Sequence, residues 1–107
     1  MGVLGEFIKN SPTIEIVSLS NNGITNSDIE LLIPFLIGHK TLKSFNISYN
    51  KGVSNRVVPL LVDLANNSII EDINVFYTSI SFIDEILALL IESKLKKGDD
   101  KVRISNV

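Results

Sequence analysis

The most informative part of this chain is the segment 41–53, which reads TLKSFNISYNKGV. Within it, Leu42 is followed by Phe45 three residues later and by Ile47 after two more. Successive side chains of a β-strand point to opposite faces, so a spacing of two places Phe45 and Ile47 on the same side of a short strand. The polar run 50–52 then predicts a turn, in which the amide of Asn50 can bond the turning backbone and also the next repeat.

The same frame recurs 28 residues before and 28 residues after this segment. A fixed period of this length is typical of architectures that stack one structural unit several times. The copies are predicted to span residues 13–40, 41–68 and 69–97. Their matching apolar positions are Ile14, Val17, Leu19 and Ile24 in the first copy and Ile70, Ile73, Val75 and Ile80 in the third.

Each turn is followed by apolar residues at helical spacing, which predicts a helix in the second half of every copy. The pair Ser27 and Glu30 reads as a capping box at the start of the first of these helices. Pro34 is expected to kink or shorten that helix, whereas Pro59 falls in the early turns of the next, where a missing N–H is harmless. The apolar stripes are Ile29, Leu32, Ile33 and Leu36, then Val57, Val58, Leu61 and Leu64, then Ile83, Ile86, Leu87, Leu90 and Ile91.

These copies define the expected fold, an α/β domain with parallel strands on one face and helices on the other. One strand–turn–helix unit cannot bury its own apolar face, but stacked units bury a continuous one. Residues 1–12 are expected to form an N-terminal capping helix, and residues 98–107 a C-terminal strand or tail. We therefore interpret residues 1–107 as a single domain.

The repeated frame resembles the leucine-rich repeat in its ribonuclease-inhibitor-like form, through the segments 14–24, 42–53 and 70–80. Within that class, the segments 40–46 and 64–68 are similar to the repeats of tropomodulin-type caps of the actin pointed end. Two departures are that Thr78 replaces the turn Asn and that the second turn has one extra residue. The resemblance implies a short, curved leucine-rich-repeat solenoid that binds other proteins on its concave strand side.

The composition argues against several classes of partner. A net charge of −2, with both signs interspersed, leaves no basic stripe of the kind that binds nucleic acid. No apolar run is long enough to span a membrane, so no membrane partner is expected. The chain has no cysteine and no signal-peptide pattern, which favours a cytoplasmic location.

The chain also lacks the residue patterns of a catalytic or cofactor site. Its one histidine, His39, lies in the turn between a predicted helix and strand, where a surface or capping role is expected. The glycines are scattered rather than gathered into a phosphate-binding loop. Acidic residues fall on successive helices as N-terminal or solvent-facing charges. We therefore expect no enzymatic activity, no cofactor and no metal site.

Candidate binding residues lie between the inward-facing strand positions, on the outer face of the predicted sheet. Three aromatics stand out there, because aromatic residues dominate protein-binding hot spots. Two interpretations stay open: these aromatics face a partner, or Phe76 and Tyr77 tuck under a loop and complete the core. The residues predicted to bind a protein partner are Tyr49, Phe76, Tyr77, Asn46, Asp72 and Asn74.

Together these features predict a non-enzymatic protein–protein interaction module that binds its protein partner through the strand face. One alternative is a self-assembling structural element, in which copies pair through an end strand or a helix face and form a homodimer. Another alternative, implied by the tropomodulin resemblance, is a regulator of the actin pointed end. The identity of the partner does not follow from the sequence.

Overall fold

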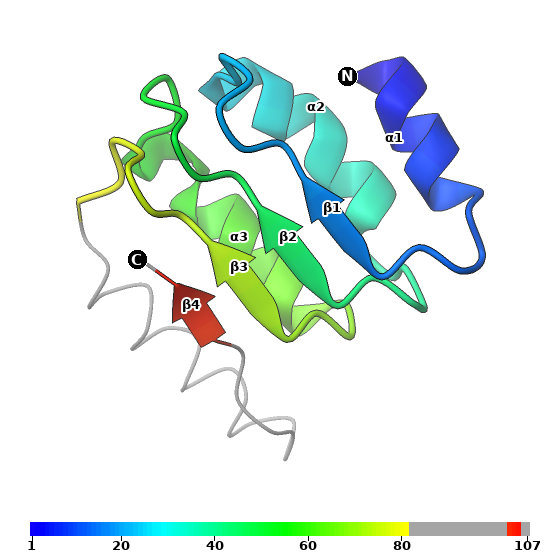
Figure 1. The fold of residues 1–107 in the computed structure, drawn as a ribbon. Coiled ribbons are helices and arrows are strands. Elements are labelled where there is room, and N and C mark those ends of the chain that lie inside the picture. Colours follow the sequence, from blue (N-terminus) through cyan, green and yellow to red (C-terminus); the bar gives the residue numbers. More distant parts are fainter. Residues whose placement is uncertain (82–102, 106–107) are drawn as a thin grey trace.

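The computed structural model of the chain describes residues 1–81 and 103–105. The third predicted helix, 83–91, lies outside the described residues. In chain order the elements are α1 (Gly2–Lys9), β1 (Ile16–Ser18), α2 (Asn26–Leu36), β2 (Ser44–Asn46), the 3-10 helix η1 (Asn55–Val57), α3 (Val58–Asn66), β3 (Asp72–Asn74) and β4 (Arg103–Ser105) (Figure 1).

Within the described residues, the sheet consists of four parallel strands in the order β1-β2-β3-β4. Its register follows the 28-residue period, because Val17 lies beside Phe45 and Phe45 beside Ile73. Ile73 in turn lies beside Ile104 of β4. Helices α2 and α3 cover one face of this sheet (Figure 1). The predicted α/β class, with parallel strands on one face and helices on the other, is confirmed.

The core lies between the sheet and the helices, and the repeated apolar frame fills it. Phe45 and Ile73, at the centres of β2 and β3, are 0% exposed. All four residues of the apolar stripe on α2 are buried as well. Ile14 and Leu19 are half-buried, because no further strand packs beside β1 within the described part of the chain.

Helix α1 packs against α2 at the start of the stack (Figure 1). Ile8 turns inward from α1 and is 1% exposed. Gly5 allows the two helices to approach closely, because a β-carbon at this position would overlap the ring of Phe35. The absence of a side chain at Gly5 therefore fixes how near α1 can lie to α2.

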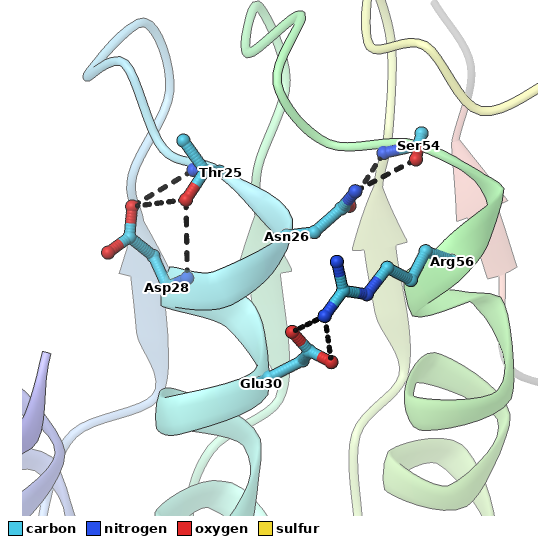
Figure 2. Close-up of polar contacts among 6 residues, drawn as sticks. All are labelled: Thr25, Asn26, Asp28, Glu30, Ser54 and Arg56. Carbon is cyan, nitrogen blue, oxygen red and sulfur yellow. Dashed lines mark hydrogen bonds and ion pairs between the residues drawn. The ribbon is translucent and has the colours of Figure 1, made fainter.

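The capping box of α2 is not the predicted pair of Ser27 and Glu30. The N-cap is Thr25, whose hydroxyl accepts the N–H of Asp28 at 3.4 Å, while the Asp28 carboxylate accepts the N–H of Thr25 at 3.0 Å (Figure 2). The predicted pair is wrong because Thr25 is still extended and forms a β-bridge with Gly52 of the next copy. This contact between copies sets the residue at which the helix begins.

Side chains near the helix starts join successive copies (Figure 2). Asn26 accepts the N–H of Ser54 at 2.8 Å and donates to its hydroxyl at 2.9 Å. Arg56 donates to both carboxylate oxygens of Glu30, at 2.9 and 3.2 Å. The sequence pattern assigned Glu30 to a cap within α2, whereas its partner lies in the following copy.

The two helical prolines occupy different positions. Pro59 lies in the first turn of α3, as predicted, so its missing N–H removes no helix hydrogen bond. Pro34 lies inside α2, which continues past it and ends at Leu36. The N–H of Ile37 still donates to the carbonyl of Ile33 at 3.1 Å, so the last turn of α2 keeps this bond.

Candidate interaction surface at the ends of the strands

The predicted aromatics lie in the loops that follow β2 and β3. Tyr49 comes three residues after the end of β2, and Tyr77 three residues after the end of β3. Because β2 and β3 are parallel and in register at the 28-residue period, these loops leave the sheet side by side. The fold therefore places the two tyrosines next to each other.

The backbone holds both tyrosines in an uncommon conformation. Their φ angles are 58° at Tyr49 and 59° at Tyr77, in the left-handed region, and φ is 56° at Asn21, the equivalent position of the first copy. This region costs an ordinary side chain about 1 kcal/mol or more, and Asn tolerates it better than Tyr. In this conformation the N–H of Asn21 donates to the carbonyl of Ser48 at 3.0 Å, and that of Tyr49 to Phe76 at 2.8 Å. The left-handed residues thus join successive loops.

The three aromatic rings form one cluster. The rings of Tyr49 and Tyr77 are stacked, with centroids 5.3 Å apart and an interplanar angle of 20°. Phe76 meets Tyr49 edge-on, with centroids 5.5 Å apart at 83°. Such aromatic pairs contribute about 0.5–1.5 kcal/mol each beyond the area they bury. The cluster is therefore a pre-formed feature of the folded loops.

The exposure of the rings separates the two interpretations left open by the sequence. Tyr49 is 49% exposed and Tyr77 is 53% exposed, while Phe76 is half-buried. The interpretation that Tyr77 completes the core is therefore wrong. Phe76 is intermediate in exposure and makes T-shaped contacts with both tyrosine rings.

A lysine that the sequence prediction missed belongs to the same cluster. The Nζ atom of Lys51 lies 5.3 Å from the centroid of the Tyr77 ring, within the range of a cation–π interaction. Its position two residues after Tyr49, in a predicted turn, was the available sequence signal. We call Tyr49, Lys51, Phe76 and Tyr77 the aromatic surface.

Asn50 fixes the loop that carries Tyr49 and Lys51. This side chain is 1% exposed, and its hydrogen bonds reach both its own loop and the loop of the preceding copy. The predicted bonding of a turn Asn to its own turn is confirmed, and the second unit that Asn50 reaches is the preceding copy rather than the predicted next one. Its Nδ2 donates to the carbonyls of Leu19, Ile47 and Ser48, each at 3.0 Å, and its Oδ1 accepts the N–H groups of Asn22 at 3.1 Å and Ile24 at 2.9 Å.

Thr78 stands at the corresponding position of the third loop, where the sequence departs from the Asn pattern. Its hydroxyl donates to the carbonyl of Val75 at 2.8 Å and accepts the N–H of Ile80 at 3.3 Å. Both partners lie in the third copy, so Thr78 ties its own turn. A hydroxyl is too short and offers too few hydrogen-bonding groups to repeat everything that an amide does here.

The other three predicted site residues do not join the aromatic surface. Asn46 accepts the N–H of Ser48 at 2.9 Å, and Asn74 accepts the N–H of Phe76 at 2.9 Å, so both shape the turns that follow their strands. Asp72 is the first residue of β3, at the end of the strand away from the aromatics. Whether any of the six predicted residues contacts a partner stays a prediction.

Two further properties concern only the described residues. Residues 1–81 and 103–105 contain no group of three or more His, Asp or Glu side chains that could hold a metal ion. Among the helices of this described part, none combines the length and apolar content that crossing a bilayer requires.

Solved structures that share this fold include two that cover most of this chain. One, described as leiomodin-1 actin-binding site 2, superposes with a TM-score of 0.75 at 18% identity and covers 95% of this chain. The other, the C-terminal domain of tropomodulin from Caenorhabditis elegans, gives a TM-score of 0.67 at 21% identity and covers 85% of this chain. The tropomodulin resemblance of segments 40–46 and 64–68 is thereby supported at the level of the fold.

The present chain is shorter than both of these structures. It spans 60% of the leiomodin chain and 57% of the tropomodulin chain. No family model and no curated protein sequence matches it. The assignment to the ribonuclease-inhibitor-like class of leucine-rich repeats therefore stays a prediction.

Proposed function

We propose that this chain is a non-enzymatic protein-binding module, that its partner is actin, and that the aromatic surface makes the contact. The observation that carries the proposal is the exposed, stacked pair of Tyr49 and Tyr77 on a fold shared with a domain described as an actin-binding site. Regulation of the actin pointed end, and a cytoplasmic location beside actin, are the finer parts of the same proposal.

The physical argument rests on preorganisation. Exposed tyrosines offer large contact areas and few rotatable bonds, which is why they are enriched in binding hot spots. Here the rings already stack on each other, and Asn50 ties the Tyr49 loop to its neighbour. Little conformational freedom remains to be lost when a partner binds, so more of the contact energy is available as affinity.

The non-enzymatic part of the proposal is supported by the environment of His39. This histidine is buried, and its Nε2 lies 2.9 Å from the carbonyl of Ile8, to which it donates. Its Nδ1 accepts the N–H of Leu42 at 3.0 Å and that of Thr41 at 3.2 Å. Both ring nitrogens therefore join α1 to the turn before β2, a structural role that leaves neither nitrogen for a substrate.

The proposal is tested with the double variant Tyr49→Asn/Tyr77→Asn. Asn already occupies the equivalent left-handed position at Asn21, so this variant keeps a backbone-compatible residue and removes both rings. We expect the wild-type chain to co-sediment with actin filaments and to slow pointed-end elongation. The variant should bind about thirtyfold more weakly or worse, since two hot-spot aromatics at about 1–2 kcal/mol each contribute about 2–4 kcal/mol together.

The matched control is Leu31→Asn, which removes an apolar side chain that is 59% exposed on α2. It should leave actin binding unchanged, while circular dichroism establishes that all three proteins are folded. A folded wild-type chain that binds neither actin monomers nor filaments would refute the proposal. A concentration-dependent dimer in light scattering, without actin binding, would favour the self-assembly alternative and its homodimer.

A further inference from the structure

The loops that follow β1, β2 and β3 are nearly free of charge. The segments 19–25, 47–54 and 75–81 contain a single charged residue, Lys51. The segments that precede the strands differ, because 10–15 and 67–71 each contain a glutamate and 38–43 contains two lysines. The aromatic surface therefore combines apolar rings and uncharged polar groups with one cation.

Two carboxylates that follow the first of these loops already have partners (Figure 2). Asp28 belongs to the capping box of α2, and Glu30 is bound by Arg56. Within residues 1–81 and 103–105, Lys51 has no ion pair, and its Nζ lies over the ring of Tyr77. This ammonium group is thus available to a carboxylate from another molecule.

The backbone of the tyrosines adds an independent observation. Asn at the equivalent position of the first copy makes the same link between loops, so that link does not require an aromatic residue. Tyr49 and Tyr77 nevertheless occupy left-handed positions that disfavour them. Residues held in sparsely populated conformations cluster at functional sites, where a specific side chain is needed despite the strain.

We propose that the aromatic surface takes a polypeptide segment that carries a carboxylate side chain next to an apolar side chain. The apolar side chain packs on the stacked rings of Tyr49 and Tyr77, and the carboxylate pairs with Lys51. This inference rests on the proposed function in that it describes the protein partner of the same surface. A nucleic-acid strand fits less well, because a single lysine on a chain of net charge −2 neutralises too few phosphates.

The test uses the full chain, labelled with ¹⁵N, and four probes of ten residues or nucleotides. The probes are a peptide rich in Glu and Leu, the same peptide with Lys in place of Glu, the same peptide with Ser in place of Leu, and oligo-dT. We expect only the Glu/Leu peptide to shift the amide signals of Tyr49, Lys51 and Tyr77. Equal or stronger shifts with the Lys/Leu peptide or with oligo-dT, or no shifts with the Glu/Leu peptide, would overturn the inference.

Two variants separate the contributions of charge and ring. Lys51→Met keeps the aliphatic stem and removes the charge, and it should weaken Glu/Leu peptide binding about fivefold at low salt. High salt should then remove most of the difference between wild type and Lys51→Met. Tyr49→Asn/Tyr77→Asn should abolish the shifts at the aromatic surface while the rest of the spectrum stays that of the folded chain.

Failure of this inference is distinguishable from failure of the proposed function. Peptide binding at the aromatic surface without any binding of actin would refute actin as the partner. It would still support a partner segment with a carboxylate side chain next to an apolar one. Actin binding that is unchanged in Lys51→Met and in its charge-reversed counterpart Lys51→Glu would refute the role of the carboxylate and retain actin as partner.

Discussion

Asn50 shows how much of the binding loop depends on one side chain. Its amide reaches three carbonyls and two N–H groups at the turns, and of these the carbonyl of Ser48 also accepts the N–H of Asn21. Buried backbone groups without partners cost more than the hydrogen bonds themselves contribute. Asn50 is therefore both a source of stability and the support of Tyr49 and Lys51, its neighbours in the same loop.

Replacing this residue gives the first stability prediction. Asn50→Ala should lower the free energy of unfolding by about 3 kcal/mol, because several buried polar groups lose their partner together. Urea denaturation followed by circular dichroism measures this change. Asn22→Ala is the control: Asn22 is exposed, and its side chain donates to the carbonyl of Ser20, so the loss should stay near 0.5 kcal/mol, about that of one exposed bond. Equal losses in the two variants would contradict the role assigned to Asn50.

Sequence patterns predicted the role of the turn Asn but missed Lys51. The turn Asn was recognisable because a polar turn follows each short strand and Asn side chains bond turning backbone. Lys51 was not recognisable as part of the site, because its proximity to Tyr77 depends on how two loops of different copies lie against each other. The exposure of Phe76 and Tyr77 was undecided for the same reason.

At the scale of elements, the start of helix α2 is set by a contact between copies and not by the local capping-box pattern. Ser27 and Glu30 fit the capping-box spacing, yet Thr25 and Asp28 form the box. The bridge between Thr25 and Gly52 keeps Thr25 extended, and the N–H of Asn26 donates to the carbonyl of Gly52 at 3.1 Å. A single copy read by itself contains no information about that bridge.

The position of the cap gives the second prediction. Thr25→Ala should lower the free energy of unfolding by about 1 kcal/mol, because α2 loses the side chain that accepts an N–H of its first turn. Ser27→Ala, one residue inside the helix start, should change it by less than about 0.5 kcal/mol. Thermal or urea unfolding of the two variants side by side measures the difference. A larger effect of Ser27→Ala would restore the original sequence interpretation.

At the scale of the whole molecule, the register of the sheet was predictable and its ends were not. The 28-residue period placed Val17, Phe45 and Ile73 in one row, and the strands pair in that row. Arg103–Ser105 pairs with β3 but follows that strand by more residues than the 28-residue period. The period alone therefore predicted only a strand or a tail for this segment. The close contact between Gly5 and Phe35 was also not predictable, because the apolar stripe of one helix does not show how closely a neighbouring helix approaches it.

The continuous row of core residues gives the third prediction. Phe45 lies at its centre with 0% exposure, so Phe45→Ala should lower the free energy of unfolding by about 3–5 kcal/mol. Because both neighbouring strands pack on this residue, the chain should still unfold in one transition. Urea curves from far-UV circular dichroism and from tyrosine fluorescence, which reports on Tyr49 and Tyr77, should coincide in wild type and variant. Separated curves would mean that the loops melt independently of the core.

The three left-handed residues have a consequence for engineering. Asn21, Tyr49 and Tyr77 occupy one column of equivalent positions, each outside the core and each at the head of a loop held by backbone bonds. Side chains in such a column, other than the β-branched ones that the left-handed backbone excludes, can be varied without touching the residues that specify the scaffold. Phage or yeast display of a combinatorial library at these three sites would turn the same small scaffold toward new targets.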